Sequence, residues 1–406
     1  MALVSELELP SFDFMDASLR GDRFHETMAS LRGQGWLAAG DLGFFVLDRE
    51  ASEFILRSKK VKFPGLQVAE IFGVTEGPLY EEITRNILNI DGDDHRRLRN
   101  LVNPVLTPRA VERYRPAMRG FIEQLVGEVA ADGRCEFVDA IAKPYPALVI
   151  ATVMGAPLED ASRLYYWSNW IQRQFSADLA DKRAEIEQAV VEFYEYVGAL
   201  LERRRSDPGD DLVSRLLAAE HEGDRLSDVE CVNLVLNVLI GGVDTSQSQL
   251  AHAVRLLAQH PDQWRLLADD PSLAGQAVEE ALRFEPIVPF TARIVMEEFD
   301  YRDVTFPAGT IVMISAFDGN RDPAMFSEPD SFDITADRER TKPMSFGAGI
   351  HYCLGANVAR AELQEALAFL PGVMPGLELD GAPEFDSING IYGLDRLPIR
   401  WRATAA

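Results

Sequence analysis

The segment Phe346-Gly347-Ala348-Gly349-Ile350-His351-Tyr352-Cys353-Leu354-Gly355-Ala356 holds a single cysteine on a glycine-rich loop. An amphipathic stretch, residues 359–370, follows directly and predicts a helix. Gly349 and Gly355 would let backbone N–H groups approach the Cys353 sulfur, because glycine has no side chain in the way. The positive N-terminal end of the following helix favours a thiolate over a thiol. The segment therefore predicts a thiolate that can ligate iron.

Two other interpretations of Cys353 stay open. A free cysteine commonly behaves as a small buried hydrophobe. Zinc is the second alternative, but it normally takes paired Cys or His ligands at short spacing. The other two cysteines, Cys135 and Cys231, lie far away in the sequence, and no Cys-x-x-Cys occurs. The iron-ligand interpretation therefore depends on the whole pattern of the loop.

The loop resembles the haem-ligand signature of the cytochrome P450 family, Phe-x-x-Gly-x-His/Arg-x-Cys-x-Gly, and fills every position of it. The resemblance implies haem b (iron protoporphyrin IX) as cofactor, bound by Cys353 at the iron, with Phe346 and Gly355 beside it. The implied fold is mainly α with small β-sheets (α+β), a triangular helical prism with haem between two long helices. Matching motifs run from about His95 to the C-terminus, so we expect a single cytochrome P450 domain over residues 1–406.

Composition and charge agree with this class of protein. The chain is 47% hydrophobic and 26% charged, as in soluble globular proteins. It has no run of about eighteen apolar residues, so we expect no membrane span. We also expect no signal peptide, and three scattered cysteines fit a reducing cytoplasm. A formal charge of −25 argues against nucleic-acid binding, which needs a basic footprint.

Hydrophobic periodicity predicts a chain dominated by helices, without internal repeats or flexible linkers. A small hairpin is expected at the start, followed by long helices, a partly extended region and short strands over the last thirty residues. The expected ranges are a hairpin of 35–38 and 43–47 around Asp41-Leu42, helices over 109–131, 184–205, 227–259 and 273–284, and extended pieces within 287–315.

Inside the third helix lies the sequence Gly241-Gly242-Val243-Asp244-Thr245-Ser246. Each mid-helix glycine costs about 1 kcal/mol relative to alanine, so stability alone does not explain the pair. The Thr245 hydroxyl, four residues after Gly241, can bond the Gly241 carbonyl and open the helix locally. Two structural alternatives remain, since the glycines could serve close helix packing and Asp244 could be a surface residue.

This second run resembles the oxygen-activation motif of the same family, Ala/Gly-Gly-x-Asp/Glu-Thr. The resemblance implies that Gly241 borders the haem, that Asp244 relays protons, and that Thr245 holds oxygen and its water. A carboxylate beside a hydroxyl can form such a relay. The implied activity is a monooxygenase that oxidises a lipophilic small molecule with O2 and two electrons.

Cationic residues recur where the family binds the two haem propionates, which need positive partners when buried. His95 and Arg99 lie four residues apart on one face of a helix that starts near Asp93, although the preceding sequence departs from the usual Asp-Pro-Pro-Glu-His. Arg293 and His351 match two further propionate positions. Any one of these alone could be a surface base.

A pair of opposite charges, Glu280 and Arg283, lies three residues apart on the fourth predicted helix. Such a pair usually decorates a solvated surface. The family resemblance implies instead a buried ion-pair network, joined by a loop arginine, that is structural rather than catalytic.

The substrate pocket is expected to be apolar with one amide, which suits a lipophilic molecule that carries a polar group. Steroids, terpenoids, macrolides and aromatic compounds all remain open as substrates. The residues expected to line it are Asn237, Ile240, Val288, Phe290 and Ile391.

Electrons would come from separate partners, a ferredoxin and its NAD(P)H-dependent ferredoxin reductase. The basic residues Arg96 and Arg97 could steer an acidic ferredoxin, or could simply form a solvated helix face. Two other functions are alternatives to a monooxygenase. A peroxide-driven peroxygenase would tend to lack the pair Asp244-Thr245, and a non-catalytic haem sensor would not need a proton relay.

Overall fold

The computed structural model describes residues 1–176, 178–219, 226–336, 338 and 341–403. The chain divides into two compact units, each assembled from separate stretches of sequence. Unit 1 comprises Met1–Pro64, Gln276–Cys353 and Glu384–Asp395. Unit 2 comprises Gly65–Gly275, Leu354–Pro383 and Arg396–Ala406.

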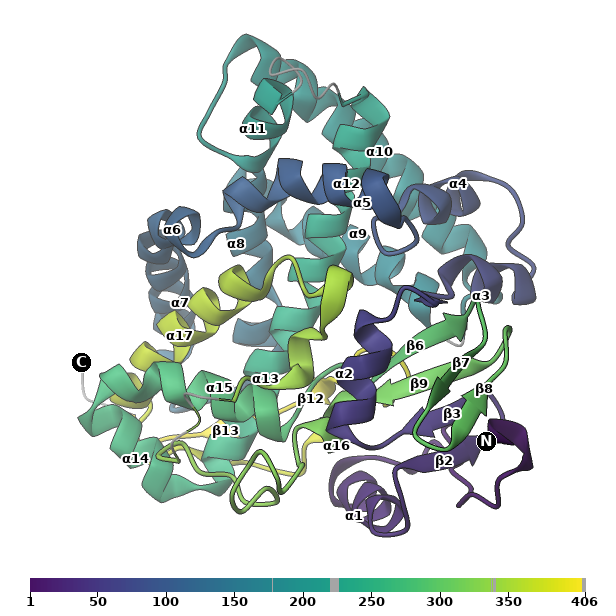
Figure 1. Cartoon of the computed structure of the whole chain (residues 1–406). Coiled ribbons are helices and arrows are strands. Elements are labelled where there is room, and N and C mark those ends of the chain that lie inside the picture. Colours follow the sequence, from purple (N-terminus) through teal and green to yellow (C-terminus); the bar gives the residue numbers. More distant parts are fainter. Residues whose placement is uncertain (177, 220–225, 337, 339–340, 404–406) are drawn as a thin grey trace. The chain divides into compact units, whose positions relative to one another are not determined.

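Unit 1 contains the larger sheet of the protein, whose strand order is β2-β3-β9-β6-β4. Strands β3 and β9 pair in parallel and the other neighbours are antiparallel. Strands β2, β3, β6 and β9 are labelled in Figure 1. The strands of this sheet are β2 (Leu37–Gly40), β3 (Gly43–Val46), β4 (Val61–Lys62), β6 (Phe290–Val295) and β9 (Ile311–Ser315). A second sheet has the order β1-β8-β7, with β1 (Ala2–Leu3), β7 (Phe299–Tyr301) and β8 (Val304–Phe306), and β11 (Glu384–Phe385) pairs with β12 (Leu394–Arg396).

The helices of unit 1 are α1 (Gly21–Arg32), α2 (Arg49–Arg57), α16 (Ala316–Gly319) and most of α15 (Ala274–Phe284). An aromatic cluster forms part of its core. The Phe290 ring lies at its centre, with centroid distances of 5.7 Å to Phe12, 5.3 Å to Phe14 and 5.4 Å to Phe45. The Phe290 side chain is 7% exposed and is therefore part of this core.

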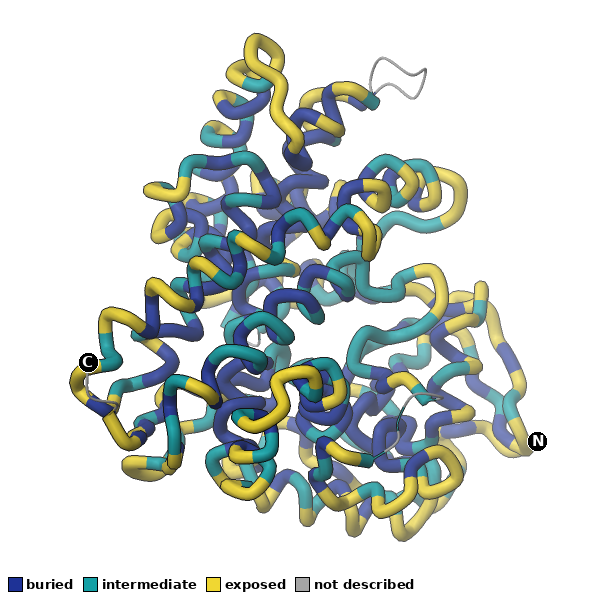
Figure 2. Tube along the Cα trace, turned by 90° about the vertical axis from the view of Figure 1, so that its left-hand side faces the viewer, coloured by how far each residue is buried: buried dark blue, intermediate teal, exposed yellow. Residues whose placement is uncertain are grey.

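Unit 2 is mainly helical, with one small sheet of order β10-β13-β5. Buried residues line the inner faces of its helices, and exposed residues gather at turns and outer faces (Figure 2). Its helices are α3 (Gly65–Ile71), α4 (Pro78–Arg85), α5 (Gly92–Val102), α6 (Pro108–Val111), α7 (Arg115–Val129), α8 (Pro144–Met154), α9 (Ala161–Gln172), α10 (Arg183–Ser206), α11 (Leu212–Ala219), α12 (Asp228–Gly242), α13 (Asp244–Gln259), α14 (Pro261–Asp269) and α17 (Ala356–Val373). Its strands are β5 (Arg134–Glu136), β10 (Glu378–Leu379) and β13 (Pro398–Arg400).

The start of α12 is fixed by a capping box. The Ser227 hydroxyl accepts the Glu230 amide hydrogen, and Glu230 in turn accepts from the Ser227 amide. Glu230 also forms an ion pair with Arg97 on α5. One carboxylate therefore links the first turn of α12 to a second helix.

The segment from Asp228 to Gln259 is also long and apolar enough to cross a membrane by composition, and 67% of its most apolar window is buried inside the protein.

Most of the predicted elements are confirmed, but the prediction of one helix is wrong. The hairpin forms with Leu37 opposite Val46, and the predicted helices 184–205 and 273–284 correspond to α10 and α15. The expected continuous helix over 109–131 is instead divided into α6, a 3₁₀ turn at Glu112–Tyr114, and α7. Pro116 explains the division, because proline has no amide hydrogen and favours the first turn of a new helix.

Candidate active site

The Cys353 loop of unit 1 folds back on itself. The Cys353 amide donates to the Phe346 carbonyl at 2.9 Å, and 3₁₀ turns at Met344–Phe346 and Gly349–His351 shape the path between them. Cys353 and Phe346 are partly exposed. Three residues after the cysteine, α17 begins at Ala356 with Gly355 as its N-cap. The loop thus presents its thiol at an accessible position close to a helix start.

The loop glycines serve different purposes. Gly349 has φ +73°, and a methyl group placed on it would lie 2.3 Å from the Leu56 carbonyl oxygen. This close contact with the backbone of α2 is one reason for a glycine at position 349. The approach of its amide to the Cys353 sulfur stays a prediction. Around Gly347 and Gly355, by contrast, such a methyl group would meet nothing within 4 Å among the described residues. Gly347 is the open position that the sequence interpretation missed.

The helix opening predicted in unit 2 is present. The Thr245 hydroxyl donates to the Gly241 carbonyl at 2.6 Å, and α12 and α13 meet at Val243, whose φ and ψ are −94° and −70°. Gly241 is exposed although Leu239 and Ile240 before it are buried. The hydroxyl therefore borders open space in the middle of a buried helix pair.

Gly241 and Gly242 have separate roles. A methyl group on Gly242 would lie 2.4 Å from Cδ1 of Ile150 on α8, so this glycine allows close helix packing. Among the described residues, a methyl group on Gly241 would meet no atom within 4 Å apart from the backbone of its own helix. The packing alternative thus accounts for Gly242 and leaves Gly241 as the open position.

Asp244 is buried, 7% exposed, rather than on the surface. Its Oδ2 accepts a hydrogen bond from the Ser168 hydroxyl at 2.5 Å, and its Oδ1 lies 3.4 Å from the Asn169 side-chain nitrogen. Burial raises the pKa of Asp244 above its usual range, although both hydrogen bonds oppose the rise. The carboxyl is therefore more readily protonated than an exposed aspartate.

A second buried acid, Glu362 on α17, was not predicted from the sequence. The hydroxyl of Ser246, the residue after Thr245, donates to Glu362 Oε1, while Oε2 has no hydrogen-bond partner among the described residues. Burial raises the Glu362 pKa to about 8. Its position offered a signal, because it lies four residues from both Val358 and Ala366 on the buried face of α17.

The four candidate propionate partners occur in two pairs. In unit 2, His95 is 2% exposed and Arg99 follows one turn later on α5, partly exposed. In unit 1, Arg293 on β6 is 6% exposed and donates to the Ala292 carbonyl at 2.7 Å, and His351 is partly exposed. Among these four candidates, each unit thus holds one arginine and one histidine.

The expected pocket residues differ in their surroundings. The Asn237 amide donates to the Asn233 carbonyl at 2.7 Å and to its side-chain oxygen at 2.9 Å. Ile240 is buried, whereas Val288 and Ile391 are partly exposed. Phe290 packs in the aromatic core of unit 1, and its role in the pocket stays a prediction.

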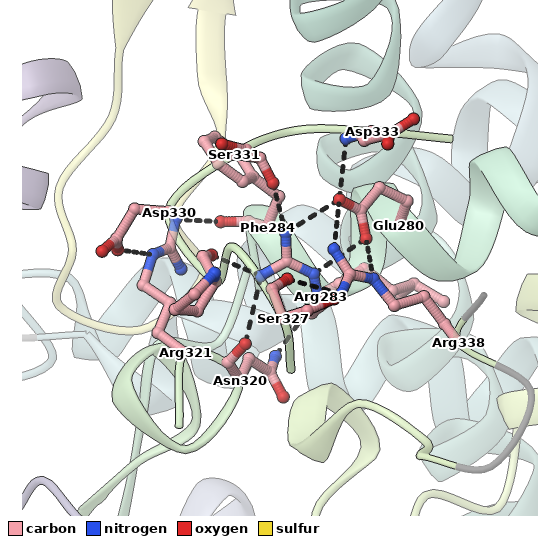
Figure 3. A network of polar contacts seen from close by, with 12 residues as sticks. Glu280, Arg283, Phe284, Asn320, Arg321, Ser327, Asp330, Ser331, Asp333 and Arg338 are labelled. Carbon is pink, nitrogen blue, oxygen red and sulfur yellow. Dashed lines mark hydrogen bonds and ion pairs between the residues drawn. The ribbon is translucent and has the colours of Figure 1, made fainter. Parts of the chain in front are cut away.

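The predicted Glu280–Arg283 pair is buried in unit 1 (Figure 3). Two Arg283 nitrogens donate to the two Glu280 oxygens at 2.8 Å each. Arg338 is the loop arginine that joins them, with its Nε 3.2 Å from Glu280 Oε2. The other Arg283 donors reach the main-chain carbonyls of Asn320, Pro329 and Ser331. Complete pairing of this kind is typical of a structural network.

These donors fit a haem. In unit 1, the accessible Cys353 thiol suits an iron ligand, and Arg293 and His351 are side chains that can donate to a propionate. In unit 2, the space beside Gly241 and the Thr245 hydroxyl suits a flat group, and His95 and Arg99 are further possible donors. No group of three or more His, Cys, Asp or Glu that could hold a metal ion occurs in the described part of the chain.

Comparison with known proteins identifies the family. The chain matches the family description "Cytochrome P450" over residues 67–268 and 272–370. It is 37% identical to luteothin monooxygenase of Streptomyces thioluteus, over 98% of this chain and 97% of that protein. Nocardicin C N-oxygenase of Nocardia uniformis subsp. tsuyamanensis is 39% identical over 74% of both.

Solved structures agree with these relatives. The crystal structure of CalO2 is similar with a TM-score of 0.90 and 31% identity, covering 98% of this chain and 100% of that one. P450BioI, solved in complex with a fatty acid ligated to acyl carrier protein, has a TM-score of 0.86 and 30% identity, covering 94% and 99%. The chain therefore belongs to the cytochrome P450 family, with its mainly helical fold and small sheets, and is a haem-dependent monooxygenase that oxidises lipophilic substrates with O2 and electrons from redox partners.

Proposed function

We propose that Cys353 would hold the iron of haem b through its thiolate, and that Asp244 and Thr245 would deliver the protons that oxygen activation consumes. The observation that carries the proposal is the opening at Gly241. There the Thr245 hydroxyl is bonded to a helix carbonyl, directly after a buried carboxyl of raised pKa.

When bound, haem supplies the activation of O2 and the insertion of one oxygen atom into the substrate. Asp244 retains a proton more readily than an exposed aspartate does, because its burial disfavours the charge. Thr245 can release the Gly241 carbonyl and orient its hydroxyl, or a water, toward the open space beside Gly241. Asp244 would give its proton to this hydroxyl or water and regain one from bulk solvent, which restores the carboxyl.

The remaining residues would bind and orient the cofactor. His95, Arg99, Arg293 and His351 are proposed as donors to the propionates, and burial of His95 and Arg293 strengthens such charge-assisted bonds. Phe346 would exclude water from the thiolate. We further propose that residues 1–406 act as one catalytic domain, since the family match spans sequence from both units.

For partners and location, we propose a ferredoxin with its NAD(P)H-dependent reductase, and a cytoplasmic protein that binds neither nucleic acid nor membrane. The three cysteines are scattered through the sequence, which supports a reducing cytoplasm. The formal charge of −25 argues against nucleic-acid binding. Arg96 and Arg97 pair with Asp93 and Glu230, so a ferredoxin docking on α5 would have to compete with these carboxylates.

The substrate is proposed to be a lipophilic small molecule with a polar group, held near Asn237, Ile240, Val288, Phe290 and Ile391. Relatives named for luteothin, nocardicin C and mycinamicin IV support a substrate from specialised biosynthesis.

The proposal is tested first at the cysteine. C353S should abolish the far-red-shifted Soret band of the reduced carbon monoxide complex, because a hydroxyl cannot replace the thiolate. C135S is the control, since burial raises the pKa of Cys135 to about 12 and its thiol is inert at neutral pH. A normal band in C353S would remove Cys353 as the ligand.

A further inference from the structure

Helix α9 supplies two consecutive side chains to one carboxyl group. The Ser168 hydroxyl and the Asn169 amide both reach Asp244, at 2.5 Å and 3.4 Å, across 76 and 75 residues of sequence. Ser168 is fully buried. A buried hydroxyl needs a partner, and here the nearest partner is the carboxyl proposed to relay protons.

The position of Ser168 in α9 makes the contact specific. Leu164, Trp167 and Ile171 on the same face are buried, so an apolar residue would be expected at 168 on packing grounds alone. Trp167 fixes this face, because its ring packs against Phe193 at 5.7 Å and its Nε1 donates to a glutamate of α10 at 2.9 Å. Ser168 is therefore held at a fixed place opposite Asp244.

The kind of partner matters for a proton relay. Among the described residues, no lysine or arginine pairs with Asp244. An arginine could only donate and would stabilise the charged carboxylate alone. A hydroxyl donates to a carboxylate and, after rotation, accepts from a carboxylic acid. Ser168 can thus remain bonded to Asp244 in both protonation states.

We propose that Ser168, assisted by Asn169, is a positioning residue of the monooxygenase reaction: it holds the Asp244 carboxyl and stays bonded to it as the acid loses and regains its proton. This inference rests on the proposed role of Asp244. Ser168 itself touches neither haem nor substrate in the proposal and acts through the carboxyl.

The test measures NADPH consumption by the haem-loaded protein with a plant ferredoxin and its reductase, in H2O and in D2O. S168A should slow consumption about tenfold, the factor expected for one lost hydrogen bond to an ionisable group, and should enlarge the solvent isotope effect. The reduced carbon monoxide band should stay normal. S248A is the matched control, because the Ser248 hydroxyl bonds the Asp244 main-chain carbonyl at 2.8 Å rather than its carboxyl. Its rate should equal that of the wild type.

D244N separates failure of this inference from failure of the proposed function. If D244N leaves the rate and isotope effect unchanged, Asp244 is not the relay and both fall. If D244N slows consumption and S168A does not, only the role of Ser168 is refuted. Should S168A fail to fold, S168T and S168V replace it, since they share a shape and differ in the hydroxyl. A slow S168V beside a fast S168T supports the proposal, and equal rates overturn it.

Discussion

Replacing Glu362 by glutamine should change how the stability of the protein depends on pH. The carboxyl is fully buried, and burial raises its pKa from an ordinary value of 4.5 to about 8. Between these values the folded state holds a proton that the unfolded state has released. Stability due to this group is therefore complete below about pH 4.5 and is lost as the pH rises toward 8.

The magnitude follows from the size of the shift. Each pH unit between the two values removes about 1.4 kcal/mol, so at pH 7 the wild type has lost about 3 kcal/mol through Glu362. E362Q cannot ionise and escapes this loss. The glutamine can still accept from Ser246, but its buried NH2 group replaces an oxygen that has no partner, at a cost of about 1–3 kcal/mol that does not depend on pH.

The prediction is therefore tested by how the stability difference between E362Q and wild type changes with pH, rather than by its value at one pH. We expect the free energy of unfolding of E362Q, relative to wild type, to rise by about 1.4 kcal/mol per unit from pH 5 to 8. Urea unfolding of both proteins, followed by circular dichroism at each pH, measures it. E365Q is the control, because Glu365 lies one turn further along α17 in ion pairs with Arg115 and Arg119. Parallel pH profiles for E362Q and wild type would refute the reasoning.

Two further substitutions test packing and charge. G242A should lower stability by about 1–3 kcal/mol, because the new methyl group would clash with Cδ1 of Ile150. In thermal melts, the double variant G242A/I150V should recover part of this loss, since valine lacks that atom. A G242A melting temperature equal to that of the wild type would contradict the close approach. R283M should cost about 3–5 kcal/mol or prevent folding, since it leaves Glu280 buried without its main partner. R400A, which breaks an exposed pair, should leave stability close to that of the wild type. Similar losses in R283M and R400A would refute the structural role of the network.

Local signals explain what could be predicted from the sequence. The Thr245–Gly241 bond spans four residues, so a glycine and a hydroxyl at that spacing sufficed to predict it. The closure of the Cys353 loop on Phe346, seven residues earlier, was not predicted. The hairpin around Asp41-Leu42 is equally local. Such features depend on backbone geometry that nearby residues determine.

The partners of the buried acids are different. Ser168 reaches Asp244 from 76 residues away, and Ser246 reaches Glu362 from 116 residues away. No periodicity indicates which serine of which helix will face a given carboxyl, because that depends on how several helices pack together. The loop arginine of the Glu280 network, Arg338, was expected as a class of residue and identified only by its contact.

The shared carboxylate Glu230 has a consequence for variation among related proteins. It closes the capping box of α12 and also pairs with Arg97 of α5, so a single substitution would disturb two helices at once. Shortening it to aspartate would force a choice between the two contacts. In related proteins, the residues at positions 97, 227 and 230 should therefore be substituted together or stay unchanged. A substitution at one of these positions would favour compensating substitutions at the other two.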